Sequence, residues 1–314
     1  MTASARPRPV HDPFRHQGVL VEPEADAAGR LLTTATVFLT GSECAWRCVM
    51  CDLWRHTTET ATPAGAIPAQ LRDAHAALRG TGTLPDVWKL YNAGSYFDRR
   101  AVPPEDDEGV AELVSGSTRV VVESHPALVG DRAWRFRDLL ARRGTTLEVA
   151  MGLETAHPEA LDAINKGVTR ESFAAAADAL RREGVALRVF LLVHPPVVPA
   201  DRRGEWLRRS VRLARSCGAE VISLIPTRST ERALQALAAA GAFVPPTLAD
   251  LEEAFADALA EAGPRVFADT WDLDAHAACP HCVEARRSRL ARQNAEQRTL
   301  DAVTCGHCAE ALAS

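Results

Sequence analysis

Short apolar runs alternate with amphipathic stretches along most of this 314-residue chain, and this alternation restricts the folds open to it. Runs rich in Val, Ile, Leu and Phe predict strands at residues 31–40, 87–91, 119–122, 147–151, 186–193, 220–225 and 266–270. Helical periodicity predicts helices at residues 69–78, 133–143, 158–164, 170–183, 203–217, 230–240, 248–260 and 283–299. Strands separated by helices form parallel βαβ units with right-handed crossovers, so we expect an α/β fold. About six or seven such units are too few for a complete eight-stranded barrel and favour a partial (βα)6 barrel.

Three cysteines follow the first predicted strand. Cys44, Cys48 and Cys51 have the spacing C-x3-C-x2-C within one loop, so three thiolates can converge on one inorganic centre. A structural zinc site is usually closed by four ligands, whereas three thiolates leave one corner of a cubane iron–sulfur cluster without a protein ligand. The alternative is three unrelated buried thiols, but free cysteines rarely group so tightly without a ligand role. The loop therefore predicts a [4Fe-4S] cluster with one open iron.

Four more cysteines form two C-x-x-C pairs near the C-terminal end of the chain. Cys279 pairs with Cys282, and Cys305 pairs with Cys308. Four thiolates complete a tetrahedral set, so the pattern predicts a second metal centre. Structural zinc and a second iron–sulfur cluster both satisfy four cysteines. The remaining Cys217 precedes a glycine near a helix end and is expected to be a small buried residue.

The overall composition limits where the chain is expected to work. No apolar run approaches the roughly 20 residues needed to span a bilayer, and the N-terminal residues lack the apolar core of a signal peptide. We therefore expect a cytoplasmic protein without a membrane partner. Eight cysteines in that compartment indicate metal or redox chemistry rather than disulfides. A net charge of -5 does not indicate a general nucleic-acid binder, and it leaves a nucleic-acid partner open.

These patterns divide the chain into three expected regions. Residues 1–30 carry prolines and charges with little periodicity and predict an N-terminal extension. Residues 31–271 contain the strands and helices of the partial barrel, and residues 272–314 form a small cysteine-rich, metal-binding extension. The helix expected between the two cysteine pairs carries several arginines, which favour either a solvated helix face or phosphate recognition.

Polar residues stand where predicted strands end, and the C-terminal ends of parallel strands line the sites of such folds. Asn92, Gly94 and Ser95 follow the second predicted strand. The glycine permits close backbone approach, and the serine hydroxyl can donate or accept a hydrogen bond; an ordinary βα turn is the alternative. Glu123 and Glu154 end two further strands, where each can bind hydroxyl or ammonium groups or, alternatively, cap the next helix.

The C-x3-C-x2-C loop resembles that of radical S-adenosylmethionine (SAM) enzymes. The resemblance implies a TIM-like partial barrel in which the open iron binds the amino and carboxylate groups of SAM, and reductive cleavage gives a 5'-deoxyadenosyl radical. It also implies that the segment from Asn92 to Ser95 contacts the SAM amino group. The residue before the third cysteine is usually aromatic in that superfamily and is Met50 here, whose thioether can pack against a purine.

Several segments resemble the Elongator and methylthiotransferase branch, in particular the radical SAM proteins of archaeosine biosynthesis and their bacterial relatives. These segments are residues 90–98, 121–126, 152–171 and 225–227. The resemblance implies that Glu154 and Glu123 face the SAM side of the barrel. It also implies an auxiliary [4Fe-4S] cluster at the C-terminal cysteines, with zinc as the alternative.

Arg188 alternates with apolar neighbours on its predicted strand. Its guanidinium is expected to point into the barrel, where it needs an anionic partner. A SAM carboxylate, a substrate phosphate, or an internal salt bridge with Glu123 or Glu154 would satisfy it.

We therefore expect a radical SAM enzyme that removes a hydrogen atom from a nucleoside- or nucleotide-type substrate. Carbon–sulfur bond formation is an option if the second centre is an iron–sulfur cluster that donates sulfide. An electron donor such as flavodoxin or ferredoxin is implied as a partner. Two alternatives stay open: a rearrangement or redox step on another small natural-product precursor, and a zinc-ribbon, SAM-binding subunit of a tRNA-modifying complex. No side chain is identified as the acid, base or radical relay.

Overall fold

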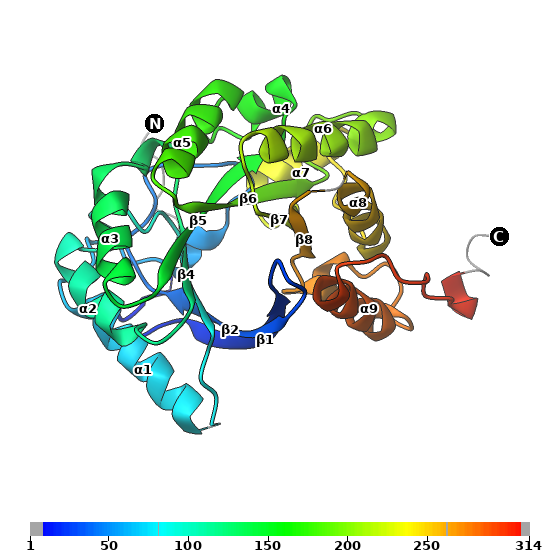
Figure 1. Cartoon of the computed structure of the whole chain (residues 1–314). Coiled ribbons are helices and arrows are strands. Elements are labelled where there is room, and N and C mark those ends of the chain that lie inside the picture. Colours follow the sequence, from blue (N-terminus) through cyan, green and yellow to red (C-terminus); the bar gives the residue numbers. More distant parts are fainter. Residues whose placement is uncertain (1–8, 81, 262, 309–314) are drawn as a thin grey trace.

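The computed structural model describes residues 9–80, 82–261 and 263–308 of the chain. These residues form one curled sheet whose strands follow in sequence order, with helices along its outer side (Figure 1). The strands are β1 (Gly18–Ala25), β2 (Leu31–Leu39), β3 (Val87–Asn92), β4 (Arg119–Glu123), β5 (Thr146–Glu154), β6 (Ala186–Val193), β7 (Val221–Pro226) and β8 (Arg265–Ala268). β1 pairs with β2 in antiparallel register, and all later neighbours pair in parallel. The parallel part confirms the expected partial barrel, because a helix follows each strand from β2 to β7.

The helices cover the outer face of the sheet. They are α1 (Ala66–Gly80), α2 (Asp107–Leu113), α3 (Asp131–Ala141), α4 (Pro158–Ala163), α5 (Arg170–Arg182), α6 (Arg203–Ser216), α7 (Arg232–Ala239), α8 (Leu248–Ala260) and α9 (Val283–Glu296). Short 3-10 helices lie at Leu53–His56, Pro104–Asp106, Pro126–Leu128, Ala200–Arg202 and Leu273–His276. Apolar strand residues such as Leu90, Val120 and Val149 are fully buried beneath the helices, and this burial stabilises the layers. Sequence analysis missed α2, because seven residues are too few to establish a helical periodicity.

The N-terminal region contributes a strand that the sequence analysis did not predict. β1 pairs with β2 along its whole length, from Gly18 opposite Phe38 to Ala25 opposite Leu31. Pro23 lies in this strand, and an edge strand tolerates a proline because not every backbone N–H there needs a partner. Residues 1–8 of this region, and residues 309–314 of the C-terminal region, lie outside the described residues.

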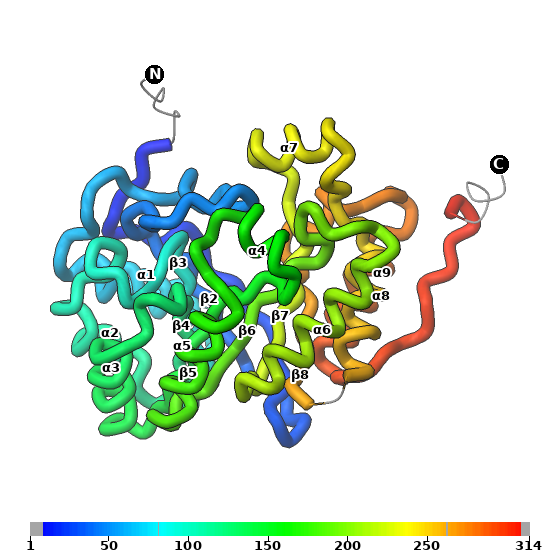
Figure 2. The backbone as a smooth tube through the Cα atoms, turned by 90° about the horizontal axis from the view of Figure 1, so that it is seen from above, coloured from blue at the N-terminus to red at the C-terminus, as the bar shows by residue number. Residues whose placement is uncertain are grey.

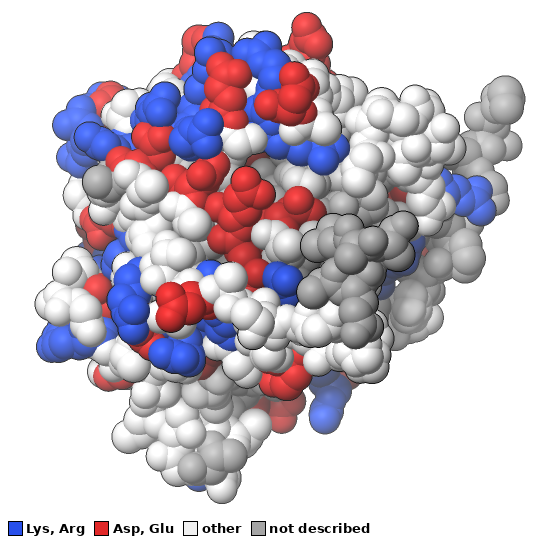
Figure 3. Space-filling model, turned by 90° about the vertical axis from the view of Figure 1, so that its right-hand side faces the viewer, with Lys and Arg blue, Asp and Glu red and all other residues white. Residues whose placement is uncertain are grey.

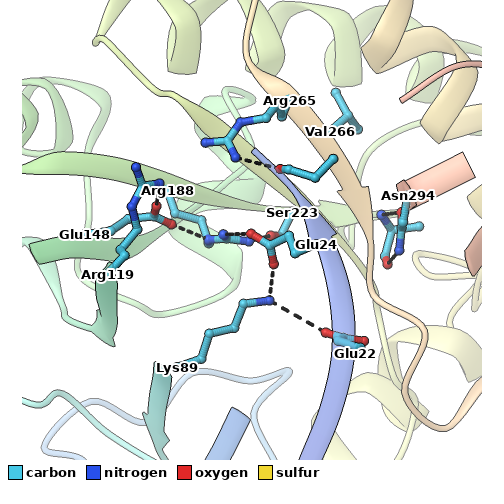
Figure 4. A network of polar contacts seen from close by, with 12 residues as sticks. Glu22, Glu24, Lys89, Arg119, Glu148, Arg188, Ser223, Arg265, Val266 and Asn294 are labelled. Carbon is cyan, nitrogen blue, oxygen red and sulfur yellow. Dashed lines mark hydrogen bonds and ion pairs between the residues drawn. The ribbon is translucent and has the colours of Figure 1, made fainter. Parts of the chain in front are cut away.

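Charged side chains inside the barrel tie β1 to the parallel strands (Figure 4). Glu24 of β1 forms ion pairs with Lys89 of β3 and Arg188 of β6. Arg188 Nε also donates to Glu148 Oε1 at 2.6 Å, and Arg119 Nη1 donates to Glu148 Oε2 at 2.7 Å. A buried ion network is stable only while each charge keeps its partners, so the edge strand is needed to neutralise the barrel interior.

The helix α9 covers the free edge of the sheet at β8. Gln297, just after α9, accepts a hydrogen bond from the Val266 N–H at 2.9 Å and donates one to the Val266 carbonyl at 2.8 Å. Asn294 likewise accepts a hydrogen bond from the Ala268 N–H at 2.8 Å and donates one to the Ala268 carbonyl at 2.9 Å. The two side-chain amides thus take the place of a ninth strand and satisfy the exposed edge. Figure 2 shows α8 and α9 together on the side of the molecule away from α1, α2 and α3.

Candidate functional site

The three-cysteine loop follows β2 and is held in place by the segment after α4. The Val49 N–H donates to the Ile164 carbonyl at 3.0 Å, and Asn165 Nδ2 donates to the Arg47 carbonyl at 3.0 Å. These contacts bring a loop near residue 48 against a segment more than 100 residues later in the chain. The loop therefore has a fixed backbone path across the C-terminal ends of the strands.

An aromatic stack fixes the middle of the same loop. The ring of Trp46 lies on the ring of His125, with centroids 3.6 Å apart and planes 10° apart. Burial lowers the pKa of His125 to about 4, so the stacked imidazole is neutral at physiological pH. On Gly167, a Cβ atom would lie 3.5 Å from the Trp46 ring, which shows how closely the backbone approaches the indole.

The end of the loop is held from the other side of the barrel. Thr230 Oγ1 donates to Asp52 Oδ2 at 2.7 Å, and the guanidinium of Arg55 pairs with Glu231 at 3.0 Å. Thr230 and Glu231 both lie in the connection between β7 and α7. The loop is therefore held at its middle and at its C-terminal end, which gives its cysteines a defined position.

The three thiols of this loop lie in an environment that disfavours free thiolates. Burial raises the pKa of Cys48 to about 11 and that of Cys51 to about 12, so the thiolates need a cationic centre to exist. Among the described residues, the thiols of this loop are not among the groups of side chains gathered closely enough to hold one metal ion. Thiolates on one tetrahedral ion would lie about 3.8 Å apart, given bonds of about 2.3 Å. Thiolates on a cubane bind separate irons and stand farther apart.

The segment after β3 lies directly beside the first cysteine. On Gly94, a Cβ atom would lie 3.6 Å from both Cα and Cβ of Cys44, so a larger residue would crowd the loop. Asn92 is buried, and both polar atoms of its amide lack a hydrogen-bond partner. Ser95 Oγ accepts a hydrogen bond from the His125 N–H at 2.7 Å. A buried, unpaired amide is unfavourable in the absence of a partner, so Asn92 is a candidate for binding a ligand.

A buried ion pair forms the opposite part of the site. Glu154, at the end of β5, pairs with Lys166. Burial acts to lower the pKa of Lys166, but the charge of Glu154 outweighs it, and the pKa lies above its ordinary value. Lys166 also acts to lower the pKa of Cys44 and Cys48, which favours thiolates. Sequence analysis did not select Lys166, since a lysine in a loop has no pattern that separates it from a surface residue.

Glu123 ends β4 close to this ion pair. Burial raises the pKa of its carboxyl to about 8, against the lowering effect of the Lys166 charge. Helix capping, the alternative for both glutamates, is wrong. The N-cap of α4 is His157, whose side chain accepts from a backbone N–H, and the N-cap of α3 is Gly130.

Comparisons with known proteins identify the fold. No protein-family model matches the chain. Archaeosine synthase subunit beta of Methanosarcina acetivorans is 27% identical over 187 residues, which are 57% of this chain and 53% of that protein. The protein of the same name from Thermococcus kodakarensis is 28% identical over 153 residues, 47% of this chain and 46% of that protein. This chain therefore spans about half the length of the curated relatives it matches.

Two solved structures share most of the chain's architecture. The archaeal Elp3 of Methanocaldococcus infernus superposes with a TM-score of 0.54 at 14% identity, covering 83% of this chain and 63% of that one. A radical SAM methyltransferase from Sphaerobacter thermophilus superposes with a TM-score of 0.57 at 16% identity, covering 85% and 80%. The chain has the radical SAM fold. Together with the sequence relatives, these neighbours confirm the predicted resemblance to the Elongator-like branch of radical SAM proteins.

Arg188 and Met50, both predicted to contact SAM, lie in different surroundings. Arg188 is 2% exposed and already paired with Glu24 and Glu148, not with the expected Glu123 or Glu154. A contact to SAM or to substrate would break these pairs, so Arg188 is better explained as part of the barrel interior. Met50 is half-buried within the cysteine loop, between Val49 and Cys51.

The two C-terminal cysteine pairs come together at one point. Cys279 Sγ lies 3.9 Å from Cys305 Sγ, and Cys282 Sγ lies 3.8 Å from Cys308 Sγ. All four sulfur atoms lie within 4.8 Å of one another, which confirms a second site able to hold a metal. The site stands at the N-terminal end of α8, beside Thr247.

The arginines of α9 do not form a free cationic surface. Arg286 and Arg289 pair with Glu252 of α8, Arg287 pairs with Asp274 and Glu284, and Arg292 and Arg298 pair with Glu296. Figure 3 shows acidic and basic side chains intermixed on the face it views, with acidic ones gathered near its middle. A solvated, internally paired helix therefore explains these arginines, and phosphate recognition is not needed. Among the described residues, no helix combines the length and apolarity that crossing a membrane requires.

Proposed function

We propose that this protein binds a [4Fe-4S] cluster through Cys44, Cys48 and Cys51, binds SAM beside it, and removes a hydrogen atom from an organic substrate. The observation that carries this proposal is the meeting of the cysteine loop with the buried, unpaired amide of Asn92 across Gly94. When bound, the cluster supplies the electron that splits SAM into methionine and a 5'-deoxyadenosyl radical. The residues around it bind, orient and exclude water.

Each polar group near the cysteine loop has a proposed task toward SAM. The amide of Asn92 and the backbone at Gly94 would bind the methionyl end, with Ser95 adding a hydroxyl donor. Glu154 would accept a hydrogen bond from SAM while Lys166 holds its carboxylate in position. Glu123 and Met50 complete the proposed set, the first through a largely protonated carboxyl near neutral pH and the second by packing on the adenine.

For the substrate, we infer a nucleoside- or nucleotide-type molecule. The support is the similarity to proteins named archaeosine synthase subunit beta, which covers about half of each relative. An electron donor of the flavodoxin or ferredoxin type would be the partner that reduces the cluster. The word subunit in those names supports one alternative, that this chain binds SAM and acts only together with another protein.

The proposal is tested by measuring 5'-deoxyadenosine after anaerobic reconstitution with iron and sulfide and reduction with dithionite. Wild type is expected to form it from SAM, and Cys48→Ala is expected to form none. The matched control is Cys217→Ala, whose thiol lies outside both cysteine groups and should leave the yield unchanged. Absence of 5'-deoxyadenosine from fully loaded wild type would instead favour the subunit alternative.

Substrate class is tested separately with candidate nucleosides deuterated at carbon. Transfer of deuterium into 5'-deoxyadenosine identifies the abstracted position, because the radical takes its hydrogen atom from the substrate. Deuterium transfer only from a compound without a base or ribose would contradict the nucleoside assignment. It would favour another small natural-product precursor.

A further inference from the structure

The four C-terminal thiols have the spacing of ligands that share one ion. The sulfur atoms of Cys279 and Cys305 lie 3.9 Å apart, and those of Cys282 and Cys308 lie 3.8 Å apart. Four sulfur atoms placed tetrahedrally at about 2.3 Å from zinc lie about 3.8 Å from one another. These two separations therefore match a single tetrahedral ion, and the other four lie within 4.8 Å.

An auxiliary cubane cluster does not fit the same positions. Its four thiolates bind four different irons and radiate away from the cluster, so they cannot all stay within 4.8 Å of one another. The loop at Cys44, Cys48 and Cys51 gives an internal comparison, since within the described part of the chain its thiols do not form a group able to hold a single ion. The two cysteine groups of one chain thus have different geometries, one open and one closed.

The two C-x-x-C turns are arranged as matching halves of one site. The first cysteines of the two turns face each other, as do the second cysteines. The rings of His281 and His307, which hold equivalent places in the two turns, stack with centroids 3.7 Å apart. The backbone N–H of His281 donates to the Cys279 sulfur, as expected for a turn that wraps a metal ion.

The surroundings of the site compensate negative charge. Four thiolates around a divalent ion carry a net charge of about -2. Arg286 donates a hydrogen bond to the Cys282 sulfur and is paired with Glu252. The site also lies beside Thr247 and Leu248, the first residues of the capped α8 helix, whose positive dipole end favours an anionic neighbour.

The site is connected directly to the free edge of the barrel. Cys282 is the N-cap of α9, and Cys279 lies three residues before it, so the site adjoins the start of this helix. At its other end, Asn294 and Gln297 satisfy the outward N–H and carbonyl groups of β8. A metal ion at the start of α9 therefore limits how far this edge cover can open.

We propose that Cys279, Cys282, Cys305 and Cys308 bind one structural zinc ion that fastens α9 over the edge of β8. The site then neither stores sulfide nor provides a second four-iron cluster. A sulfur atom for any carbon–sulfur bond would have to come from elsewhere. This proposal is independent of the activity at the first cysteine loop.

The metal is identified by measuring iron, acid-labile sulfide and zinc in the full-length protein, purified without oxygen and supplied with both metals. We expect about four irons and one zinc per chain. Cys279→Ser/Cys305→Ser should lose the zinc and keep the iron, whereas Cys44→Ala/Cys48→Ala/Cys51→Ala should lose the iron and keep the zinc. The control Cys217→Ser should change neither. About eight irons, with four lost in the C-terminal variant, would overturn the proposal, and so would iron alone or no metal at the C-terminal site.

The fastening role is tested by hydrogen exchange at β8. Loss of zinc, by substitution or by a thiol reagent that releases it from wild type, should make the amides of Val266 and Ala268 exchange roughly tenfold faster. The Val121 amide in the middle of the sheet should keep its protection. Gln297→Ala should accelerate exchange at Val266 while the zinc content stays at one per chain. Unchanged exchange at β8 after complete zinc loss would show that the ion does not hold α9.

Discussion

Lys166 and Glu154 form a buried ion pair. The pair fits only because residue 152 is glycine and has no side chain there. A Cβ atom on Gly152 would overlap both the Lys166 ammonium and the Glu154 carboxylate. The backbone at Glu154 also takes a left-handed conformation, with φ of 66°. The pair is therefore placed by backbone and packing together, which is typical of a group whose position matters for function.

We predict that Gly152→Ala leaves the fold intact and lowers SAM cleavage. The new methyl group meets the ends of two flexible side chains rather than backbone, so the ion pair moves while the strand stays. Displacement of a positioning group by about 1 Å can cost up to about a hundredfold in rate, so a decrease of about tenfold or more is expected. The measurement is 5'-deoxyadenosine yield at equal iron content. Gly80→Ala, where a Cβ meets nothing within 4 Å, is the control.

A second prediction separates a structural role of the ion pair from a role toward SAM. Lys166→Met leaves the Glu154 carboxylate buried without its cation, and we expect a loss of about 3–5 kcal/mol in unfolding free energy. Lys166→Met/Glu154→Gln should recover most of that stability, because no uncompensated charge remains. SAM binding, followed by equilibrium dialysis, should stay weak in the double variant. Full recovery of SAM binding would mean that the pair serves only the fold.

Replacing Asn92 should make the SAM-free protein more stable and should weaken SAM binding. Its buried amide has no partner, so Asn92→Leu should raise the unfolding free energy of the SAM-free protein by about 1–2 kcal/mol. The same change should weaken SAM binding by about tenfold. Gln70→Leu is a matched comparison, since the Gln70 amide is also buried but bonds Thr40 and Pro13. That variant should be destabilised, and a similar loss for Asn92→Leu would contradict the ligand role.

The ion network in the barrel predicts how stability depends on pH. Burial alone would raise the pKa of Glu24, but Arg188 and Lys89 outweigh it and hold the pKa at about 2, against an ordinary 4.5. A carboxyl with a lowered pKa contributes stability that is present above pH 4.5 and lost as the pH falls toward 2. Denaturant titrations over this range should therefore show a steeper loss for wild type than for Glu24→Gln.

Near pH 7, Glu24→Gln should lower the unfolding free energy by about 3–5 kcal/mol, because Lys89 and Arg188 each lose a buried anionic partner. Glu22→Gln is the control, as Glu22 is 35% exposed and lies 3.6 Å from Lys89. Its effect should be within about 1 kcal/mol. Equal effects for the two variants would show that β1 does not complete the barrel interior.

The strand order was predictable from the sequence, and β1 was not. Parallel strands buried on both faces appear as continuous apolar runs, and β4 and β6 were identified in this way. In β1, Glu22, Pro23 and Glu24 interrupt any such run. Glu24 is stabilised there by cations from β3 and β6, and sequence spacing gives no indication of partners so far away.

In the candidate site, too, contacts between distant segments could not be predicted from the sequence. Cysteine spacing was enough to predict that Cys279, Cys282, Cys305 and Cys308 come together, because cysteines in two C-x-x-C pairs can reach one centre. The cluster at Cys44, Cys48 and Cys51 stays a prediction. At the C-terminal cysteines, spacing alone did not separate a cluster from a single ion, since that difference lies in the distances between sulfur atoms. Lys166 and the buried state of Asn92 also depend on packing between distant segments, which only the folded chain reveals.

The central claim is that SAM binds an open iron held by Cys44, Cys48 and Cys51. Its most direct test is electron paramagnetic resonance of the reduced protein, with and without SAM carrying 15N at the methionyl amino group. We predict that SAM changes the g-values of the cluster and that the nitrogen label couples to it, in wild type and in Cys279→Ser/Cys305→Ser alike. A cluster signal that SAM leaves unchanged, with no coupling to the label, would contradict the binding of SAM to an open iron.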